Sequence, residues 1–290
     1  TFGKKMKLEE EFFNRDFLMS YSGLNKLLFS PDAFYRHYIL GQKDDTQTQS
    51  MIEGSLLHCL LLQPEEFEKL YILNHEDLPS PSQQGLMNYL FNYYKADLEH
   101  GSAREELSQY EGEILDYLKD INLYQSLKND AGRLTKIFTE KNETYWEYLK
   151  KAEGRLVIDH DTYNHITEAV DRIKSNPKVM ECLGFFADSM NGITTMNEIT
   201  LTDIETPYEF GLRGIIDNLV FDPTKKEIRI NDLKSTTKNL NSFRDSIDYY
   251  KYWIQASIYF RLVEKLYANK PEYEGWSIAY RFIVVDKIYR

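Results

Sequence analysis

The sequence predicts an α/β protein with a central mixed β-sheet flanked by helices, and one stretch carries most of the evidence. Gly211–Phe221 is an apolar run interrupted by a single carboxylate, and residues 222–226 have turn composition. Glu227–Lys234 alternates apolar and polar side chains as a second strand. A helix is expected over Tyr249–Leu266 and a further strand over Ser277–Asp286. Strands followed by a helix and another strand are typical of such a sheet.

Strand alternation places an acid and a lysine on one face of the second strand. Asp232 and Lys234 share that face with two isoleucines. A charge on an apolar strand face is costly unless it has a partner or a metal ion. Asp217 on the preceding strand supplies a second carboxylate, so the pair can share a hard divalent cation while the ammonium orients water or stabilises a phosphate oxyanion. The alternative is a surface hairpin whose charged side chains are merely solvated.

This arrangement resembles the active-site core of the PD-(D/E)XK nuclease superfamily, in which an acid on one strand precedes Asp/Glu-x-Lys on the next. The matching residues are Asp217 and Asp232-Leu-Lys234. The spacing Gln255-x-x-x-Tyr259 resembles a helix of the branch containing RecB-type nucleases, phage lambda-type exonuclease and exodeoxyribonuclease VIII-like (RecE-like) prophage enzymes. The resemblance implies that these five residues are catalytic in a metal-dependent deoxyribonuclease with a restriction-endonuclease-like α/β core.

The resemblance also implies a site for Mg²⁺ or Mn²⁺. Gly54-x-x-x-His58 on an apolar helical run, followed by Pro-Glu-x-Phe, is similar to the first motif of the exodeoxyribonuclease VIII-like enzymes, whose histidine contributes to the metal site. The implied ligands are His58, Asp217, Asp232 and the backbone carbonyl of Leu233. A lone histidine on an apolar helix is more often a satisfied core residue, which is the alternative for His58.

Roles for the remaining residues follow from the same resemblance. Lys234 is expected to position the attacking water or to steady charge on the phosphate. Gln255 and Tyr259, one helical turn apart, are expected to face the site and to fix Lys234 or the scissile strand. Glu198 lies on a β-like stretch over Thr194–Leu201, where the family often has an acid. It is expected either as a supporting or second-metal carboxylate or as a simple exposed acid.

The amino-terminal segment carries a candidate site for the 5′-phosphate of DNA. In lambda-type exonuclease an arginine and two hydroxyl side chains at the spacing of Arg15, Ser20 and Ser22 hold that phosphate, and the resemblance extends the role to these residues. Capping is the alternative for the serines, because either suits the N-cap of a helix through Leu28. One family feature differs, since Ile215 stands where a basic residue is common, and Arg213 is the alternative source of that contact.

Composition limits the class of protein. The 290 residues carry a formal net charge of −11 and are 42% apolar, which describes an ordinary globular protein and argues against a generally basic nucleic-acid binder. Cys59 and Cys182 are too few for a disulfide framework or a four-cysteine cluster, so we expect a reducing compartment, the cytoplasm of a bacterial host cell. No apolar run approaches the ~20 residues that span a bilayer, so no membrane association is expected.

We expect one nuclease domain over residues 1–290, with a helical amino-terminal part to about residue 180 and the sheet core from about residue 190. A polar helical insertion lies between the motifs. Its expected helices are Ser82–Leu98, Glu105–Tyr117, Asn122–Leu127 and Asp161–Ser175. Within it, the aromatic pair Tyr145-Trp146 either contacts DNA or packs in the interior.

The resemblance implies digestion of duplex DNA from a 5′ end in phage or prophage recombination, by a homo-oligomer whose partner is a single-strand annealing protein. Two other functions remain open. One is a different nuclease on the same core, such as a single-strand exonuclease or an endonuclease. The other is a non-catalytic DNA-binding protein, against which the intact Asp217, Asp232 and Lys234 argue.

Overall fold

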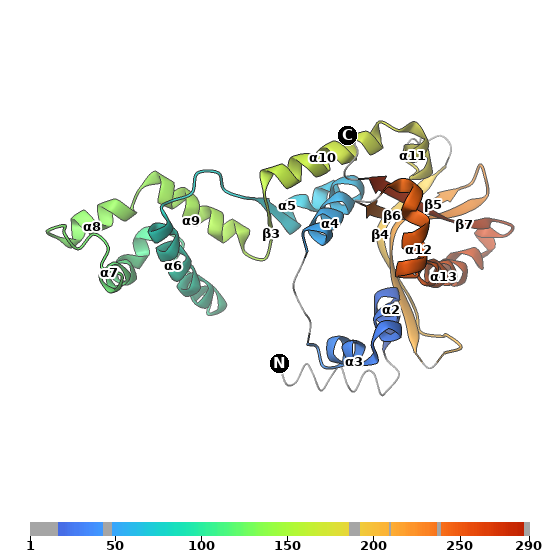
Figure 1. Cartoon of the computed structure of the whole chain (residues 1–290), viewed down its shortest axis with the longest axis horizontal. Helices are drawn as coiled ribbons and strands as arrows, with labels where there is room; N and C mark the ends of the chain where they lie inside the picture. The colour runs from blue at the N-terminus through green and yellow to red at the C-terminus, as the bar shows by residue number, and fades with distance from the viewer. Residues whose placement is uncertain (1–16, 43–47, 186–191, 209, 237–238, 287–290) are drawn as a thin grey trace. The chain divides into compact units, whose positions relative to one another are not determined.

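The computed structural model describes residues 17–42, 48–185, 192–208, 210–236 and 239–286. The chain divides into two compact units with separate hydrophobic cores. The sheet unit comprises residues 1–65 and 164–290, and the helical unit comprises residues 66–163 (Figure 1). The helical unit is therefore a continuous segment between two parts of the sheet unit, while the expectation of one nuclease domain stays a prediction.

A five-stranded mixed sheet forms the sheet unit; the mixed sheet flanked by helices is confirmed, and one of its strands, β1, was not predicted. β5 (Gly211–Asp222) pairs antiparallel with β4 (Thr194–Asp203) along one edge. Along its other edge, β5 pairs antiparallel with β6 (Glu227–Thr236) near its carboxyl end and parallel with β1 (Leu18–Met19) at its first two residues. β7 (Ser277–Asp286) continues the sheet parallel to β6.

Helices cover this sheet, and α2 begins at one of the two caps that the sequence indicates. Ser20 accepts a hydrogen bond from Gly23 N at the start of α2, and Thr48 accepts one from Met51 N at the start of α4. The α-helices that lie in this unit or begin at its boundary are α2 (Tyr21–Phe29), α3 (Pro31–Phe34), α4 (Gln49–Leu62), α10 (His160–Lys174), α11 (Pro177–Cys182), α12 (Phe243–Tyr250) and α13 (Tyr252–Val263). Shorter π- and 3₁₀-helical turns are 35–39, 64–66, 240–242, 264–268 and 271–273.

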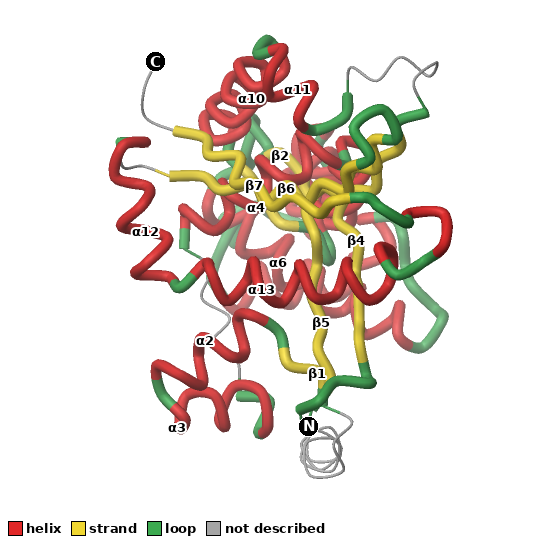
Figure 2. The backbone as a smooth tube through the Cα atoms, turned by 90° about the vertical axis from the view of Figure 1, so that its right-hand side faces the viewer, coloured by secondary structure: helices red, strands yellow, loops and turns green. Residues whose placement is uncertain are grey.

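The core of the sheet unit lies between α13 and the sheet. Ile254, Ile258 and Leu262 of α13 are buried in one cluster with Ile228 and Ile230 of β6. In Figure 2, α13 crosses β5, which it contacts. Burying each large aliphatic side chain contributes about 1.5–3 kcal/mol, so this layer holds α13 on the sheet. The predicted alternation of β6 is confirmed, since its isoleucines face α13.

The helix expected over Tyr249–Leu266 is interrupted. α12 ends at Tyr250 and α13 begins at Tyr252, because Lys251 between them has a left-handed backbone with φ of 54°. Residues other than glycine, asparagine and aspartate rarely adopt this conformation, so composition gives no signal for the break. The prediction of one continuous helix is wrong at this point.

The helical unit has its own elements, which are α5 (Phe67–Leu70), β2 (Tyr71–Leu73), α6 (Pro81–Glu99), the 3₁₀ turn 107–110, α7 (Glu111–Asp120), α8 (Asp130–Ile137), α9 (Glu140–Ala152) and β3 (Leu156–Ile158). β2 and β3 form a small parallel pair. Tyr145 and Trp146 are buried in its core, and the Trp146 indole donates to the carbonyl of Glu105 at 2.8 Å. The packing alternative for this aromatic pair is confirmed.

One expectation for the helical unit fails. Residues 122–127 form turns instead of a helix, because Asn122 and Tyr124 have positive φ values. α8 and α9 were not predicted, although Asn129 and Thr139 cap them. Among the described residues, none of the helices is long and apolar enough to cross a membrane.

Candidate metal and catalytic site

The site lies where two neighbouring strands diverge. The pairing of β5 with β6 ends at Asn218 opposite Asn231, and Asp217 and Asp232 are the next residue on each strand. Beyond this point the Asp217 carboxylate takes the place of a strand partner, since its Oδ2 accepts a hydrogen bond from Leu233 N at 2.6 Å. Both acids are buried. Because the strands separate here, their carboxylate oxygens can bond to side chains from other elements.

Helix α4 brings an imidazole to this point. His58 Nδ1 lies 3.1 Å from Glu198 Oε1 and 3.7 Å from Asp217 Oδ1. On the other side of the ring, Nε2 lies 3.1 Å from the carbonyl oxygen of Leu233. Ligand atoms of His58, Glu198 and Asp217 all lie within 4.8 Å of one another. Four predicted positions therefore meet: His58, Asp217, the Leu233 carbonyl and Glu198.

The backbone at Glu198 is strained. Its φ is 49°, although it lies inside β4 between the pairs Asn197 with Asn218 and Ile199 with Ile216. That register places Glu198 opposite Asp217. A left-handed residue that is not glycine costs roughly 1–2 kcal/mol, and such strain concentrates at functional sites. The strained residue, Glu198, is also the one whose carboxylate bonds to His58.

A second cluster surrounds Asp232. Its two oxygens are occupied by Lys234 Nζ at 2.6 Å and by the Gln255 amide at 2.8 Å. The same amide nitrogen of Gln255 lies 3.1 Å from the Tyr259 hydroxyl oxygen, which it can use as an acceptor. Lys234 Nζ also lies 4.9 Å from the centre of the Tyr252 ring, within the range of a cation–π contact. Gln255 and Tyr259 therefore face the site, where Gln255 bonds to Asp232 instead of Lys234 and Tyr259 bonds to Gln255.

Burial and mutual repulsion shift the acids toward their protonated forms. Burial raises the pKa of Asp217 to about 7, and the nearby Asp232 adds to the rise. The pKa of Asp232 is also raised, chiefly by burial, although Lys234 opposes the shift. Burial lowers the pKa of His58, but its hydrogen bond to Glu198 and the charge of Asp217 outweigh burial, so the pKa of the imidazole is raised. The site therefore binds protons near neutral pH.

Comparison with known proteins identifies the family. A model of the PD-(D/E)XK nuclease superfamily matches residues 18–287. The chain belongs to this superfamily. A crystal structure described as a "Putative exonuclease" from Eubacterium rectale is 13% identical to the chain, covers 93% of this chain and 68% of its own, and superposes with a TM-score of 0.42. No curated protein gives a significant match.

The donor set of this superfamily member fits a divalent cation. Imidazole nitrogen and carboxylate oxygen are ligands that Mn²⁺ accepts, and Mg²⁺ prefers the oxygens. The pKa values of Asp217 and Asp232 are both raised, in part because the two carboxylates repel each other. A bound cation would reduce this repulsion. His58, Glu198, Asp217 and the Leu233 carbonyl would hold the ion, whereas Asp232 is bonded to Lys234 and Gln255. A ligand role for Asp232 stays a prediction.

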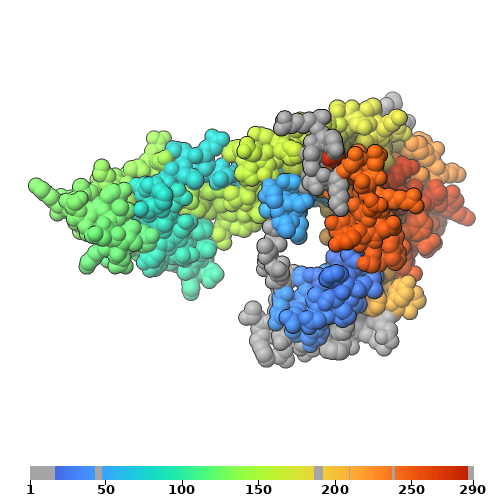
Figure 3. All heavy atoms as spheres, in the orientation of Figure 1, coloured from blue at the N-terminus to red at the C-terminus, as the bar shows by residue number. Residues whose placement is uncertain are grey.

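The serines of the predicted phosphate site begin α2 in this nuclease fold. Ser20 Oγ lies 3.1 Å from Ser22 Oγ, and the Tyr38 hydroxyl donates to Ser22 at 3.2 Å. The capping role of Ser20 is confirmed. Arg15 lies outside the described residues. Tyr21 lies between the two serines; its hydroxyl donates to the carbonyl of Tyr250 and its ring packs against Tyr252. The start of α2 therefore lies beside α13, and in Figure 3 the blue atoms of the amino-terminal segment meet the orange atoms of this region.

Sequence reasoning missed Tyr252 as a neighbour of Lys234 and left the role of Glu198 undecided. Tyr252 opens α13 only because Lys251 breaks the helix. Glu198 reaches His58 only because β4 pairs with β5 in one particular register. One sequence pattern could have grouped Glu198 with the other two acids: Glu198, Asp217 and Asp232 are each adjacent to an asparagine.

The affinity of the site for Mn²⁺ is expected to rise steeply from pH 6 to pH 8. Asp217, with a pKa of about 7, and His58, with a raised pKa, must lose protons before they can act as ligands. Calorimetry at pH 6, 7 and 8 in two buffers of different ionisation enthalpy measures the affinity and the protons released. Roughly one proton per ion is expected near pH 7. A dissociation constant that does not change with pH would contradict this ligand set.

Gly214→Ala is expected to destabilise the fold by about 1–3 kcal/mol and to slow cleavage, because overpacking displaces Tyr259 from Gln255. A Cβ at Gly214 would lie 2.6 Å from Cε1 and 2.8 Å from Cδ1 of Tyr259. Urea unfolding and single-turnover cleavage measure the two effects. Gly112→Ala in α7 is the control, because its added Cβ meets nothing within 4 Å; a stabilisation of about 0.5–1 kcal/mol is expected there. Wild-type stability in Gly214→Ala would refute the close packing.

Proposed function

We propose that this protein is a metal-dependent DNA exonuclease that hydrolyses phosphodiester bonds from the 5′ end of duplex DNA. The observation that carries the proposal is the meeting of His58, Glu198 and Asp217 beside the Asp232–Lys234 pair. The match to the PD-(D/E)XK nuclease superfamily supports the choice of DNA as substrate. We propose Mg²⁺ or Mn²⁺ as the ion.

The ion, when bound, supplies positive charge that stabilises the attacking water and the phosphate. Asp217 would hold it with one oxygen, because its Oδ2 is fixed by Leu233 N. Glu198 and His58 would complete the set from β4 and α4. A neutral imidazole is required for ligation, so His58 must give up its proton when the ion binds.

Lys234 would orient the attacking water or stabilise the charge that develops on the phosphate. Its position is fixed by Asp232 at 2.6 Å and by the Tyr252 ring. Gln255 donates to the other oxygen of Asp232, which keeps that carboxylate turned toward the lysine. A charge held in place before the reaction needs no reorganisation in the transition state, and this is how preorganised sites lower barriers.

The position of α2 supports action at a 5′ end. Its amino terminus presents Ser20 and Ser22, and a helix amino terminus attracts phosphate. Tyr21 links this terminus to Tyr252, which contacts Lys234. A terminal phosphate held by the two serines, with Arg15 of the same segment, would present a nearby phosphodiester to the lysine. A role in phage recombination, a homo-oligomeric assembly and a single-strand annealing partner are proposed on the sequence resemblance alone.

The test uses linear duplexes labelled either at a 5′ end or internally, with and without Mg²⁺, and a covalently closed plasmid. The proposal expects metal-dependent release of mononucleotides from the 5′ end, a preference for 5′-phosphate over 5′-hydroxyl, and an intact plasmid. Plasmid cutting would instead indicate an endonuclease, and digestion of single strands alone would indicate a single-strand exonuclease. Binding without cleavage in any metal would identify a non-catalytic DNA-binding protein.

A further inference from the structure

A row of three asparagines runs across the sheet immediately beside the acids of the site. Asn197, Asn218 and Asn231 lie opposite one another on β4, β5 and β6. Each stands next in sequence to an acid of the site, namely Glu198, Asp217 and Asp232. Successive side chains of a strand point to opposite faces. The row therefore lies on the face of the sheet opposite the carboxylates.

Hydrogen bonds connect the row from strand to strand. The Asn231 amide donates to Asn218 Oδ1 at 2.7 Å, and the Asn218 amide donates to Asn197 Oδ1 at 2.8 Å. Asn218 and Asn231 are each only 1% exposed. Buried amides are costly unless they are bonded, and linked amides polarise and strengthen one another. The row therefore fixes the register of the three strands at the last pair before β5 and β6 diverge.

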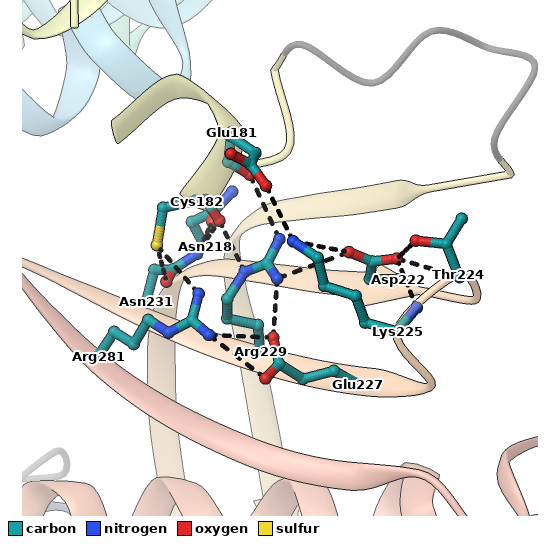
Figure 4. A network of polar contacts seen from close by, with 10 residues as sticks. All are labelled: Glu181, Cys182, Asn218, Asp222, Thr224, Lys225, Glu227, Arg229, Asn231 and Arg281. Atoms are coloured by element: carbon teal, nitrogen blue, oxygen red, sulfur yellow. Dashed lines mark hydrogen bonds and ion pairs between the residues drawn. The ribbon is translucent and has the colours of Figure 1, made fainter. Parts of the chain in front are cut away.

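Both ends of the row are attached to helices. Asn231 donates to the carbonyl of Cys182 at 2.8 Å and Asn218 donates to that of Leu183 at 3.2 Å, so the carboxyl end of α11 is held on the sheet. Arg229, which is buried beside them, donates to the same Cys182 carbonyl at 2.8 Å (Figure 4). At the other end, Asn197 donates to the carbonyl of Leu62 at 2.9 Å.

Leu62 is the last residue of α4, the helix that carries His58. One chain of side-chain hydrogen bonds therefore connects the four elements that supply the proposed metal-binding groups: α4, β4, β5 and β6. The three amides bond to one another and to the carbonyls of Leu62, Cys182 and Leu183. An effect of the row on the ligands would therefore pass through the backbone of the adjacent residue. Glu198 is the ligand that would depend most on such support, because its left-handed conformation is strained.

We propose that Asn197, Asn218 and Asn231 are positioning residues that set the spacing of the metal-binding groups. The inference rests on the metal site of the proposed function. Removing a side chain that holds a metal ligand in place typically weakens metal binding about 10–100-fold. Loss of the Asn197 amide frees the end of α4, and loss of the Asn218 amide breaks the row at its centre.

The experiment measures Mn²⁺ binding by calorimetry in the full-length protein at pH 8, without DNA, and thermal unfolding in EDTA. The variants are Asn197→Ala and Asn218→Ala. Asn142→Ala is the matched control, because Asn142 is 1% exposed and its amide donates to the carbonyl of Ile137 at 2.8 Å within the helical unit. We expect the row variants to bind Mn²⁺ about tenfold or more weakly. We expect the control to unfold at a lower temperature with wild-type affinity for Mn²⁺.

Wild-type Mn²⁺ affinity in both row variants, together with a loss of stability like that of the control, would show that the row is only structural and would overturn the proposal. If Asn218→Ala does not fold, Asn197→Ala decides by the same criterion, because Asn197 is only partly buried. A wild-type protein that binds no Mn²⁺ would overturn the metal site and this proposal together. The two failures are therefore distinguishable.

Discussion

Asp217→Asn should reduce single-turnover cleavage at least about a thousandfold, which corresponds to a loss of about 4 kcal/mol of transition-state stabilisation. The substitution removes the carboxylate that lies between His58 and Leu233 N. Asparagine keeps the volume and an oxygen that can accept from Leu233 N. The loss is therefore expected to fall on metal binding while the fold is kept. Calorimetry with Mn²⁺ checks the cause, and equal affinities in wild type and variant would exclude Asp217 as a ligand.

The same variant should be more stable than the wild type at pH 8 when metal is removed. The pKa of Asp217 is about 7 in the folded protein and ordinarily 3.8, so the folded state binds this proton more tightly than the unfolded state. The stability of the wild type should therefore fall as pH rises from about 4 to about 7 and stay low above it. Asparagine avoids that loss, which has an upper limit of about 4 kcal/mol.

Asp222→Asn is the matched control, since Asp222 is also buried on β5. Burial raises the pKa of Asp222, but hydrogen bonds from Thr224 and Lys225 N outweigh burial, so the pKa is lowered. The sign of the stability change is therefore opposite. Asp222→Asn should destabilise the protein at pH 8 and leave Mn²⁺ affinity unchanged. Thermal unfolding at pH 5 and pH 8, in EDTA and in Mn²⁺, separates the two carboxylates.

Lys234→Ala should lower the single-turnover rate by about a hundredfold or more while binding of duplex ends is largely retained. Lys234 acts on charge that develops in the transition state, so its loss should affect turnover more than the ground-state complex. The measurement combines single-turnover cleavage in Mg²⁺ with an equilibrium DNA titration in Ca²⁺. A variant that cleaves at the wild-type rate but binds DNA poorly would show that Lys234 only binds phosphate.

Lys265→Ala controls for the loss of a buried ion pair. Lys265 Nζ lies 2.6 Å from the buried Asp203, the same separation as between Lys234 and Asp232. Removing Lys265 should therefore lower stability in a similar way. Because Lys265 bonds to Asp203 and Glu205, which are not residues of the site, the cleavage rate of the folded protein should stay near that of the wild type.

Local rules predicted the residues on β6 and α13. Alternation placed Asp232 and Lys234 on one face of a strand, and helical spacing placed Gln255 beside Tyr259; the structure has both arrangements. These relations depend only on neighbours within one element. The sequence could not show which acid stands opposite Asp217, because this depends on the register between β4 and β5.

The same limit explains the errors elsewhere. Lys251 has a left-handed backbone that its side chain does not favour, so only packing around α12 and α13 accounts for the break. Asn122 and Tyr124 likewise turn the chain where the composition indicates a helix. The partners of Asn197, which include the carbonyl of a helix end 135 positions away, follow from tertiary structure alone.

Because the helical unit is inserted between two parts of the sheet unit, it affects the order in which the chain folds and the site assembles. His58 bonds to Glu198 across 140 positions and to the Leu233 carbonyl across 175 positions. Contacts this distant in sequence form slowly, whereas the helical unit between them is held by a core of nearby residues. During synthesis from the amino terminus, the helical unit can collapse while β5 and β6 have yet to be made. The nascent chain therefore carries its histidine without the carboxylates of those strands, and the site can form only after β4, β5, β6 and α13 have been synthesised.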